Sequence, residues 1–216
     1  MSFKWYLLAL LLLVACAPSD SEVSRILQQY SSDLEKIENQ QLRDQISPSF
    51  QKYFPDPYPD GLSMMEVGRR DVTHSTSRTV EMKTGEKTVT VLDGYRVLYA
   101  YPDFDQPFVK IHVEQSSPEN FEADKAVVLE QLKGFENETL HVQEIDKAGR
   151  KFYVLNMASF DVGVRAMALL FVPEEQMIVT MYLLNQEKSP FKTEEEFLDL
   201  EEKFFNGLAE SLNKVK

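Results

Sequence analysis

The sequence predicts a mixed α+β fold: a mostly antiparallel sheet covered by helices (an α/β/α sandwich), preceded by an N-terminal amphipathic helix. Three observations lead to this prediction. Apolar and polar residues alternate along several short segments after Met64, as they do in half-buried strands. Three later segments are apolar on both faces, and such strands need cover on both sides of the sheet. Other segments repeat apolar residues every three or four positions, as amphipathic helices do.

The composition is that of an ordinary globular protein. The chain has 216 residues, of which 43% are hydrophobic and 27% are charged. It carries 23 Lys and Arg residues against 35 Asp and Glu residues, and its formal net charge is -12. Because negative charge repels phosphate backbones, the composition argues against a nucleic-acid partner.

The N-terminus has the layout of an export signal. A short positive segment ending at Lys4 precedes an apolar run from Trp5 to Val14, and the chain turns polar at Ser19. The run is far shorter than the roughly 20 residues that a helix needs to cross a bilayer. We therefore expect it to direct export rather than to form a transmembrane anchor.

The junction Leu13-Val14-Ala15-Cys16 resembles the bacterial lipobox, in which an obligatory cysteine follows branched and small residues at the end of the signal. The resemblance implies cleavage between Ala15 and Cys16 and attachment of acyl chains such as palmitate to Cys16, which makes the lipid bilayer a partner. Each buried CH₂ contributes about 0.8 kcal/mol, so two or three chains anchor a protein effectively permanently.

The lipobox resemblance also implies a location outside the cytoplasm. Ala17 resembles the pattern sent to the outer membrane, so we expect the periplasmic face of the outer membrane in a Gram-negative host, and otherwise the outer face of the cytoplasmic membrane. Two alternatives stay open: an ordinary secretory signal cleaved nearby, and an uncleaved interfacial helix. Both leave Cys16, the single cysteine of the chain, without a role.

The segment after the signal predicts a helical arm. Between Asp20 and Ile46 apolar residues recur at steps of three and four, and Pro48 ends this helix because the residue before a proline is pushed out of the α region. Alternating prolines from Pro55 to Pro59 then predict an extended connector. The predicted parts are a signal peptide (1–15), a helical arm with its connector (16–61) and an α+β globular domain (62–216).

Period-two patterns predict antiparallel strands joined by short turns. The apolar positions of these strands are Met65, Val67, Val80, Met82, Val89, Val91, Val109, Ile111 and Val113. Tyr95, Tyr99 and Tyr101 form a stripe with Val97, for which core packing under a helix is favoured over a ligand platform. The strands that are apolar on both faces are expected at 152–160, 164–172 and 177–184.

Two further helices complete the pattern. Ser117 predicts an N-cap with Pro118 at the first helical position, and this helix is expected to stop near Gly134. Thr193 predicts the cap of a closing helix. The inward-facing residues of the two helices are Phe121, Val128, Leu132, Phe197, Phe204, Leu208 and Leu212.

This element order resembles the PsbP/DcrB-like α/β/α sandwich. The resemblance covers roughly Val89 to Lys216 and rests on Gly94-Tyr95-Arg96-Val97, a proline after the strand, a helix, hairpins around a glycine and a C-terminal helix. It implies a scaffold used for binding and assembly rather than catalysis. The N-terminal helix and the extra strands depart from that pattern.

The sequence contains no catalytic motif and implies no cofactor. It has no His-Glu-x-x-His, no Gly-x-Ser-x-Gly and no glycine-rich phosphate loop, and one cysteine cannot build a thiolate metal site. His74 lies in a polar segment, and His112 and His141 point to the polar side of their strands. Solvated or rim histidines are therefore favoured over metal ligands.

Asn156 and Asp161 are the candidate ligand contacts, because they interrupt or end an apolar strand and a buried polar group needs a partner. A local structural hydrogen bond is the simpler interpretation of both.

The chain combines a strong anchoring signal with a domain that has no catalytic signature. This combination predicts a bacterial envelope lipoprotein with a non-catalytic binding or accessory role. An envelope protein is a possible partner. Two alternatives stay open. The first is an envelope hydrolase whose site is built from scattered residues. The second is an immunity or inhibitor protein, whose acidic face blocks a basic active site.

Overall fold

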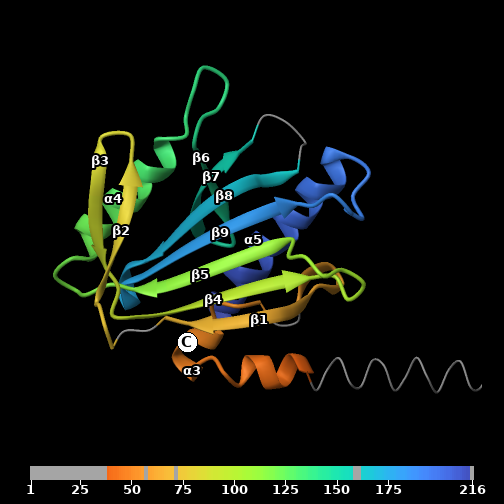
Figure 1. Cartoon of the computed structure of the whole chain (residues 1–216), viewed down its shortest axis with the longest axis horizontal. Helices are drawn as coiled ribbons and strands as arrows, with labels where there is room; N and C mark the ends of the chain where they lie inside the picture. Colours follow the sequence, from red (N-terminus) through yellow and green to blue (C-terminus); the bar gives the residue numbers. More distant parts are fainter. Residues whose placement is uncertain (1–37, 56–57, 71–72, 158–161, 215–216) are drawn as a thin grey trace, which may run out of the picture. The chain divides into compact units, whose positions relative to one another are not determined.

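A seven-stranded antiparallel sheet forms the centre of the compact unit from Leu42 to Lys216 (Figure 1). The structure is a computed structural model and describes residues 38–55, 58–70, 73–157 and 162–214. In spatial order the strands are β1 (Ser63–Arg69), β4 (Asp93–Ala100), β5 (Val109–Gln115), β9 (Met177–Asn185), β8 (Gly163–Val172), β7 (Arg150–Asn156) and β6 (Gln143–Lys147). All neighbouring pairs are antiparallel, which confirms the predicted α+β class with a large antiparallel sheet.

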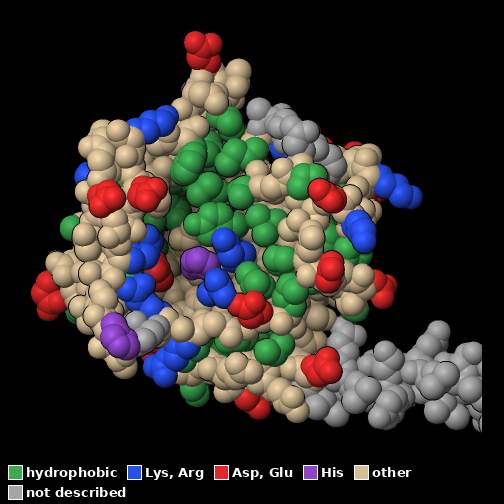
Figure 2. Space-filling view, in the orientation of Figure 1, with side chains coloured by type: hydrophobic (Ala, Val, Ile, Leu, Met, Phe, Trp, Pro, Cys, Tyr) green, Lys and Arg blue, Asp and Glu red, His purple; other side chains and the backbone are tan. Residues whose placement is uncertain are grey.

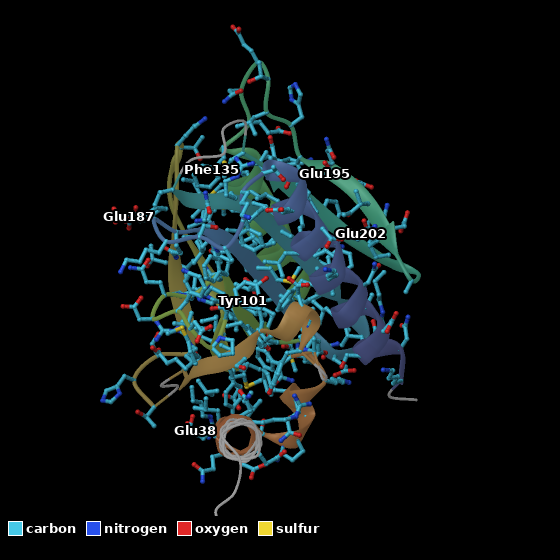
Figure 3. All side chains as sticks on the ribbon, turned by 90° about the vertical axis from the view of Figure 1, so that its right-hand side faces the viewer. Glu38, Tyr101, Phe135, Glu187, Glu195 and Glu202 are labelled. Atoms are coloured by element: carbon cyan, nitrogen blue, oxygen red, sulfur yellow. The ribbon has the colours of Figure 1, made fainter. Side chains whose placement is uncertain are left out.

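The C-terminal helix α5 (Glu194–Lys214) covers one face of the sheet. Glu195 and Glu202 lie on its exposed side (Figure 3). The hydroxyl of Thr193 accepts a hydrogen bond from the backbone N–H of Glu196 at 3.3 Å, which confirms the predicted cap. The predicted inward residues are also confirmed, because the buried side chains of α5 include Phe197, Phe204, Leu208 and Leu212.

The tyrosine stripe of β4 belongs to the core under α5. The ring of Tyr99 meets Phe204 edge-on, with ring centroids 5.4 Å apart. Tyr95 packs against Phe50 of the short helix α3 (Pro48–Gln51), with centroids 5.0 Å apart. The preferred interpretation, core packing, is confirmed for Tyr95 and Tyr99. Tyr101 follows the end of β4 and is only partly buried, and its hydroxyl donates a hydrogen bond to Asp60.

Part of the segment expected to form the helical arm contributes to the same core, because Ile46, Phe50, Tyr53 and Phe54 are buried in it. The connector is not extended throughout, since residues Pro59–Gly61 form a 3-10 turn, η1. The amphipathic helix predicted from residue 20 onward falls mostly outside the described residues. The division of the chain at residue 61 stays a prediction.

A smaller layer stands on the opposite face of the sheet. It consists of helix α4 (Phe121–Lys133) and the hairpin of β2 (Ser77–Met82) and β3 (Gly85–Thr90). The second core beneath it consists of Val80, Val89, Val91, Phe121, Val128, Leu132, Leu155, Leu169 and Ile178. This layer covers only part of the sheet, and the rest of the face is open in Figure 2.

Strand β1 departs from the predicted alternation. Its pairing with β4 is irregular between Met64 and Glu66, as at a β-bulge. Met64 is consequently 4% exposed, whereas Met65, which the period-two pattern placed inside, is 38% exposed. The extra residue shifts the inward side by one position, so the prediction for Met65 is wrong.

Helix α4 begins later than predicted. Its N-cap is Asn120 rather than Ser117, because the carbonyl of Ser117 first closes a turn by accepting hydrogen bonds from the backbone N–H groups of Asn120 and Phe121. The hydroxyl of Ser117 nevertheless accepts a hydrogen bond from the backbone N–H of Asn120 at 3.2 Å, as a capping side chain would. The predicted end is confirmed, since Gly134 is the C-cap.

Candidate ligand-binding cleft

Strand β5 separates core side chains from those of the open face. Its odd-numbered residues from 109 to 113 are buried in the core under α5. Because side chains alternate along a strand, Lys110, His112 and Glu114 project from the other face. The prediction that His112 points to the more polar side of its strand is confirmed.

Cross-strand register places two rows of side chains on this face. In one row, His112 lies between Arg96 of β4 and Thr180 of β9. In the next row, Lys110 lies opposite Tyr182 of β9. Directly opposite residues of paired strands are within side-chain contact, although these residues are far apart along the chain.

Two adjoining hollows open over these rows, and together we call them the sheet cleft. They share Arg78, His112 and Glu114 in their walls. The first, of about 410 Å³, lies over β1, β4 and β5, and the second, of about 210 Å³, lies between α4 and the sheet. Figure 2 shows a hollow at the centre of this face, with a histidine and several basic side chains in it.

Arg78 of β2 links the hairpin to the sheet across the cleft. Its Nε lies 2.8 Å from both carboxylate oxygens of Glu114. Both side chains are largely buried, with 26% and 13% of their surfaces exposed. A shielded pair of this kind holds the covering layer in register with β5.

His112 carries a buried polar atom without a partner. Among the described residues, nothing hydrogen-bonds to its Nε2. Burial first, and then the positive charges of Lys110, Arg96 and Arg78, together lower the pKa of His112 to about 4. The imidazole is therefore neutral at pH 7 and can exchange a hydrogen bond with a bound molecule at Nε2.

Lys110 has a positive charge that no carboxylate neutralises within 4 Å among the described residues. Its Nζ lies 4.4 Å from the centroid of the Tyr182 ring, a cation–π contact. The ring of Tyr182 also meets His112, with centroids 5.7 Å apart. Burial lowers the pKa of Lys110, and the charge of Arg96 lowers it as well.

Positive charge accumulates in the first hollow. The described residues that line it include four arginines, Arg69, Arg70, Arg78 and Arg96, but Glu114 as the one carboxylate. Arg69 pairs with Asp93 and Arg96 with Glu66 at exposed positions, where ion pairs contribute little and rearrange easily. In a chain of net charge -12, this is a local reversal of sign.

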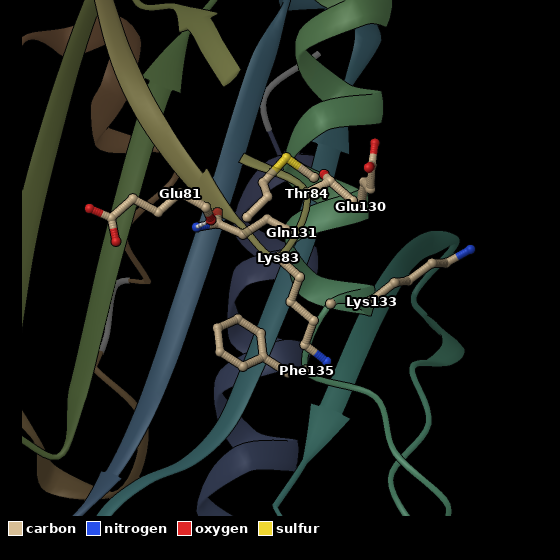
Figure 4. A pocket seen from close by; sticks show the side chains of 9 residues that line it. Glu81, Lys83, Thr84, Glu130, Gln131, Lys133 and Phe135 are labelled. Carbon is tan, nitrogen blue, oxygen red and sulfur yellow. Dashed lines mark hydrogen bonds between the residues drawn. The ribbon is translucent and has the colours of Figure 1, made fainter. Parts of the chain in front are cut away.

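A separate hollow of about 570 Å³ lies between the tip of the β2–β3 hairpin and the C-terminal end of α4 (Figure 4). Phe135 and Met82 supply its apolar wall, and Lys83, Lys133 and Glu130 rim it. Phe135 is 49% exposed. Because no buried unpartnered polar atom lies in its described wall, it offers less to fix a ligand than the sheet cleft does.

The structure places the predicted ligand contact Asn156 away from the cleft. Asn156 pairs with Ala166, which belongs to the core under α5, and its side chain donates a hydrogen bond to Glu201 of α5. This contact is structural but not local, and Oδ1 of Asn156 is buried with no hydrogen-bond partner among the described residues. Asp161, the other candidate, lies outside the described residues.

The remaining predicted residues are not brought together. Ala15 and Cys16, the cleavage and lipidation positions, lie outside the described residues. His74 and His141 are exposed and line neither part of the sheet cleft. His112 is therefore the one described histidine in the cleft, and the scattered-residue hydrolase gains no histidine cluster from the described part of the chain.

Within the part of the chain that the structure describes, no group of three or more His, Cys, Asp or Glu side chains is arranged to hold a metal ion. No helix in the described ranges has the length and apolarity to span a membrane. In comparisons with known proteins, no family model, no curated protein and no solved structure matches this chain.

Proposed function

We propose that this chain is an exported lipoprotein of the bacterial envelope whose domain binds a ligand in the sheet cleft and catalyses no reaction. The observation that carries the binding role is the buried, unpartnered Nε2 of His112 in a hollow between two layers of the fold. A buried polar atom without a partner is costly, and a ligand would supply that partner.

The chemistry of the cleft favours binding over catalysis. A histidine with a pKa of about 4 is a weak base at neutral pH. Nucleophilic catalysis needs a base within hydrogen-bond reach of the nucleophile, and Nε2 of His112 has no such neighbour among the described residues. A site that holds a ligand needs neither feature.

The lipid anchor rests on the sequence Leu13-Val14-Ala15-Cys16. Acyl chains on Cys16, palmitate among them, would hold the domain at the periplasmic face of the outer membrane, or at the outer face of the cytoplasmic membrane in a host without one. An envelope protein is a further partner that such a location allows.

We also infer the finer architecture, an α/β/α sandwich of the PsbP/DcrB-like kind preceded by an amphipathic helix. Cover by α5 on one face of the sheet and by α4 on the other supports this assignment. A scaffold of this type fits a binding role rather than a catalytic one.

Replacing Cys16 by serine tests the anchor. We expect Cys16→Ser, produced in bacteria supplied with labelled palmitate, to incorporate no label and to leave the detergent phase on phase separation, because serine has no thiol to carry the lipid. Ser21→Ala, which alters a neighbouring polar residue, should be labelled like the wild type. Labelled Cys16→Ser protein would refute the assignment of Cys16.

A variant with an obstructed cleft tests the binding role. Met167 is half-buried in the wall of the second hollow, and tryptophan in its place should fill the hollow. The unfolding temperatures of the wild type and of Met167→Trp are measured in the presence of small-molecule fractions extracted from bacterial envelopes. We expect at least one fraction to raise the unfolding temperature of the wild type but not of Met167→Trp, since a ligand stabilises only the state that binds it. If no fraction raises the temperature of the wild type, the binding role is wrong.

A further inference from the structure

One half of the open face of the sheet is positively charged, and the other half is apolar. On β4 and β5 it carries two positive charges: Arg96 lines the cleft beside His112, and Lys110 lies next to the cleft, opposite Tyr182. On β8 and β7 it becomes apolar, because Met167 and Tyr153 join the second core there as partly buried side chains. Figure 2 shows this division, with basic side chains beside a green apolar area on the same face.

Tyr182 lies at the boundary between the two halves. On one side it stands opposite Lys110, whose ammonium lies over its ring at 4.4 Å. On the other side it stands opposite Met167 of β8. A molecule seated on Tyr182 would therefore meet a cation at one end and an apolar side chain at the other.

We propose that the sheet cleft binds an amphiphilic organic anion, whose charged group lies at Arg96 and His112 with Lys110 at the edge of the cleft, and whose apolar part lies along Tyr182 and Met167. This inference rests on the proposed function, since it names the class of ligand for the same cleft. The shared chemistry of the charged group is an oxyanion: a carboxylate, a phosphate or a sulfate.

Three physical arguments favour an anion. Lys110 has no carboxylate within 4 Å among the described residues, and Arg96 pairs only with Glu66 at an exposed position. The positive groups repel one another, and an anion between them removes that repulsion. Nε2 of His112 gains a hydrogen-bond partner from an oxyanion, which accepts at several lone pairs.

The apolar half of the face argues against inorganic phosphate as the complete ligand. Burial of an apolar chain over Tyr182 and Met167 adds about 0.8 kcal/mol for each CH₂ removed from water. The net negative charge of the chain also argues against a flat anionic membrane surface as the ligand. Such a surface would contact the carboxylates around the cleft as well as the cleft itself, and like charges repel one another.

The test measures affinities of short-chain probes by calorimetry, with the Cys16→Ser protein at low salt. The anionic probes are octanoate, octyl phosphate and octyl sulfate, and they distinguish the three oxyanions. The matched probes are 1-octanol, octyltrimethylammonium and inorganic phosphate. We expect at least one anionic amphiphile to bind at least about tenfold more tightly than each matched probe, which is the effect of one charge-assisted hydrogen bond.

Variants locate the charged group. Lys110→Gln and Arg96→Gln should each weaken binding of the preferred anion about tenfold, whereas Lys151→Gln, which removes an exposed lysine of β7 outside the cleft, should not. Lys110→Arg should restore most of the affinity, which separates the effect of charge from a folding defect. The ring resonances of His112 should shift on binding, while those of exposed His74 stay in place.

The outcomes of these measurements distinguish the proposal that the cleft binds an amphiphilic anion from the proposal that it binds any ligand. Equal binding of 1-octanol and octanoate, or unchanged affinity in Lys110→Gln and Arg96→Gln, overturns the anion while leaving a binding cleft. Failure of every anionic amphiphile to bind at millimolar concentration also overturns it. Binding only to phosphatidylglycerol vesicles would replace it by a membrane surface. If envelope fractions fail too, the proposed function itself is wrong.

Discussion

Replacement of Phe204 by alanine is expected to lower the free energy of unfolding by about 3 to 5 kcal/mol. Phe204 is fully buried between α5 and the sheet, where its ring meets Tyr99 of β4. Truncation removes the transfer free energy of the ring and leaves a cavity that the packed aromatic side chains cannot close. For a domain of this size the unfolding temperature should fall by about 10 °C.

The matched control lies on the same helix. Leu198 of α5 is 39% exposed, so Leu198→Ala should change the free energy of unfolding by no more than about 0.5 kcal/mol. Urea denaturation of both variants gives the comparison, with the denaturant dependence of the free energy unchanged. Equal losses in the two variants would contradict the packing of α5 against the sheet through Phe204.

The sequence predicted correctly which side chains face the core wherever the spacing of apolar residues alone determines burial. The inward residues of α5 follow from apolar spacing alone, and Thr193 marks the start of that helix because its hydroxyl satisfies a free N–H group. The tyrosines of β4 were also placed correctly, since period two puts Tyr95 and Tyr99 on one face. In these cases local pattern and tertiary packing agree.

The predictions for Met65 and Ser117 were wrong because strand pairing and turn hydrogen bonds override the local residue pattern there. Met65 fits a regular strand, but the irregular pairing of β1 with β4 turns Met64 inward instead. Ser117 is a good cap by residue type, yet its carbonyl closes a turn before α4 begins at Phe121. Neither the bulge nor the turn leaves a distinct mark on the sequence.

The cleft could not be located from the sequence because strand register creates it. His112 was correctly assigned to the polar face, but its neighbours Arg96 and Thr180 come from β4 and β9, and Arg78 reaches it from a separate hairpin. The one available signal was the set of basic and histidine residues at alternate positions of β4 and β5. Without the strand order, this set looks like an ordinary solvated face.

On the opposite face of the sheet, a buried carboxylate should make stability depend on pH. Glu201 of α5 is 7% exposed, and one of its oxygens, Oε2, has no hydrogen-bond partner among the described residues. Burial raises the pKa of Glu201 from 4.5 to about 7, although the hydrogen bond from Asn156 and the charges of Arg165 and Lys147 act in the other direction.

The direction of the effect follows from proton binding. Between pH 4.5 and 7 the folded protein holds the proton of Glu201, while the unfolded chain has released it. Stability falls with rising pH wherever the folded state binds more protons. Glu201 therefore lowers the free energy of unfolding as the pH rises through this window, and above pH 7 its full cost of about 3 kcal/mol is present.

We expect Glu201→Gln to be more stable than the wild type by about 2 to 3 kcal/mol at pH 8, because glutamine keeps the shape of the side chain without the buried charge. The difference should shrink toward zero near pH 4, where Glu201 is protonated in both states. Glu210→Gln, at an exposed position of α5, is the matched control and should show no such trend. Urea denaturation across this pH range measures both variants, and a Glu201→Gln protein that gains no stability at pH 8 would show that the carboxylate reaches solvent or is neutralised in the folded protein.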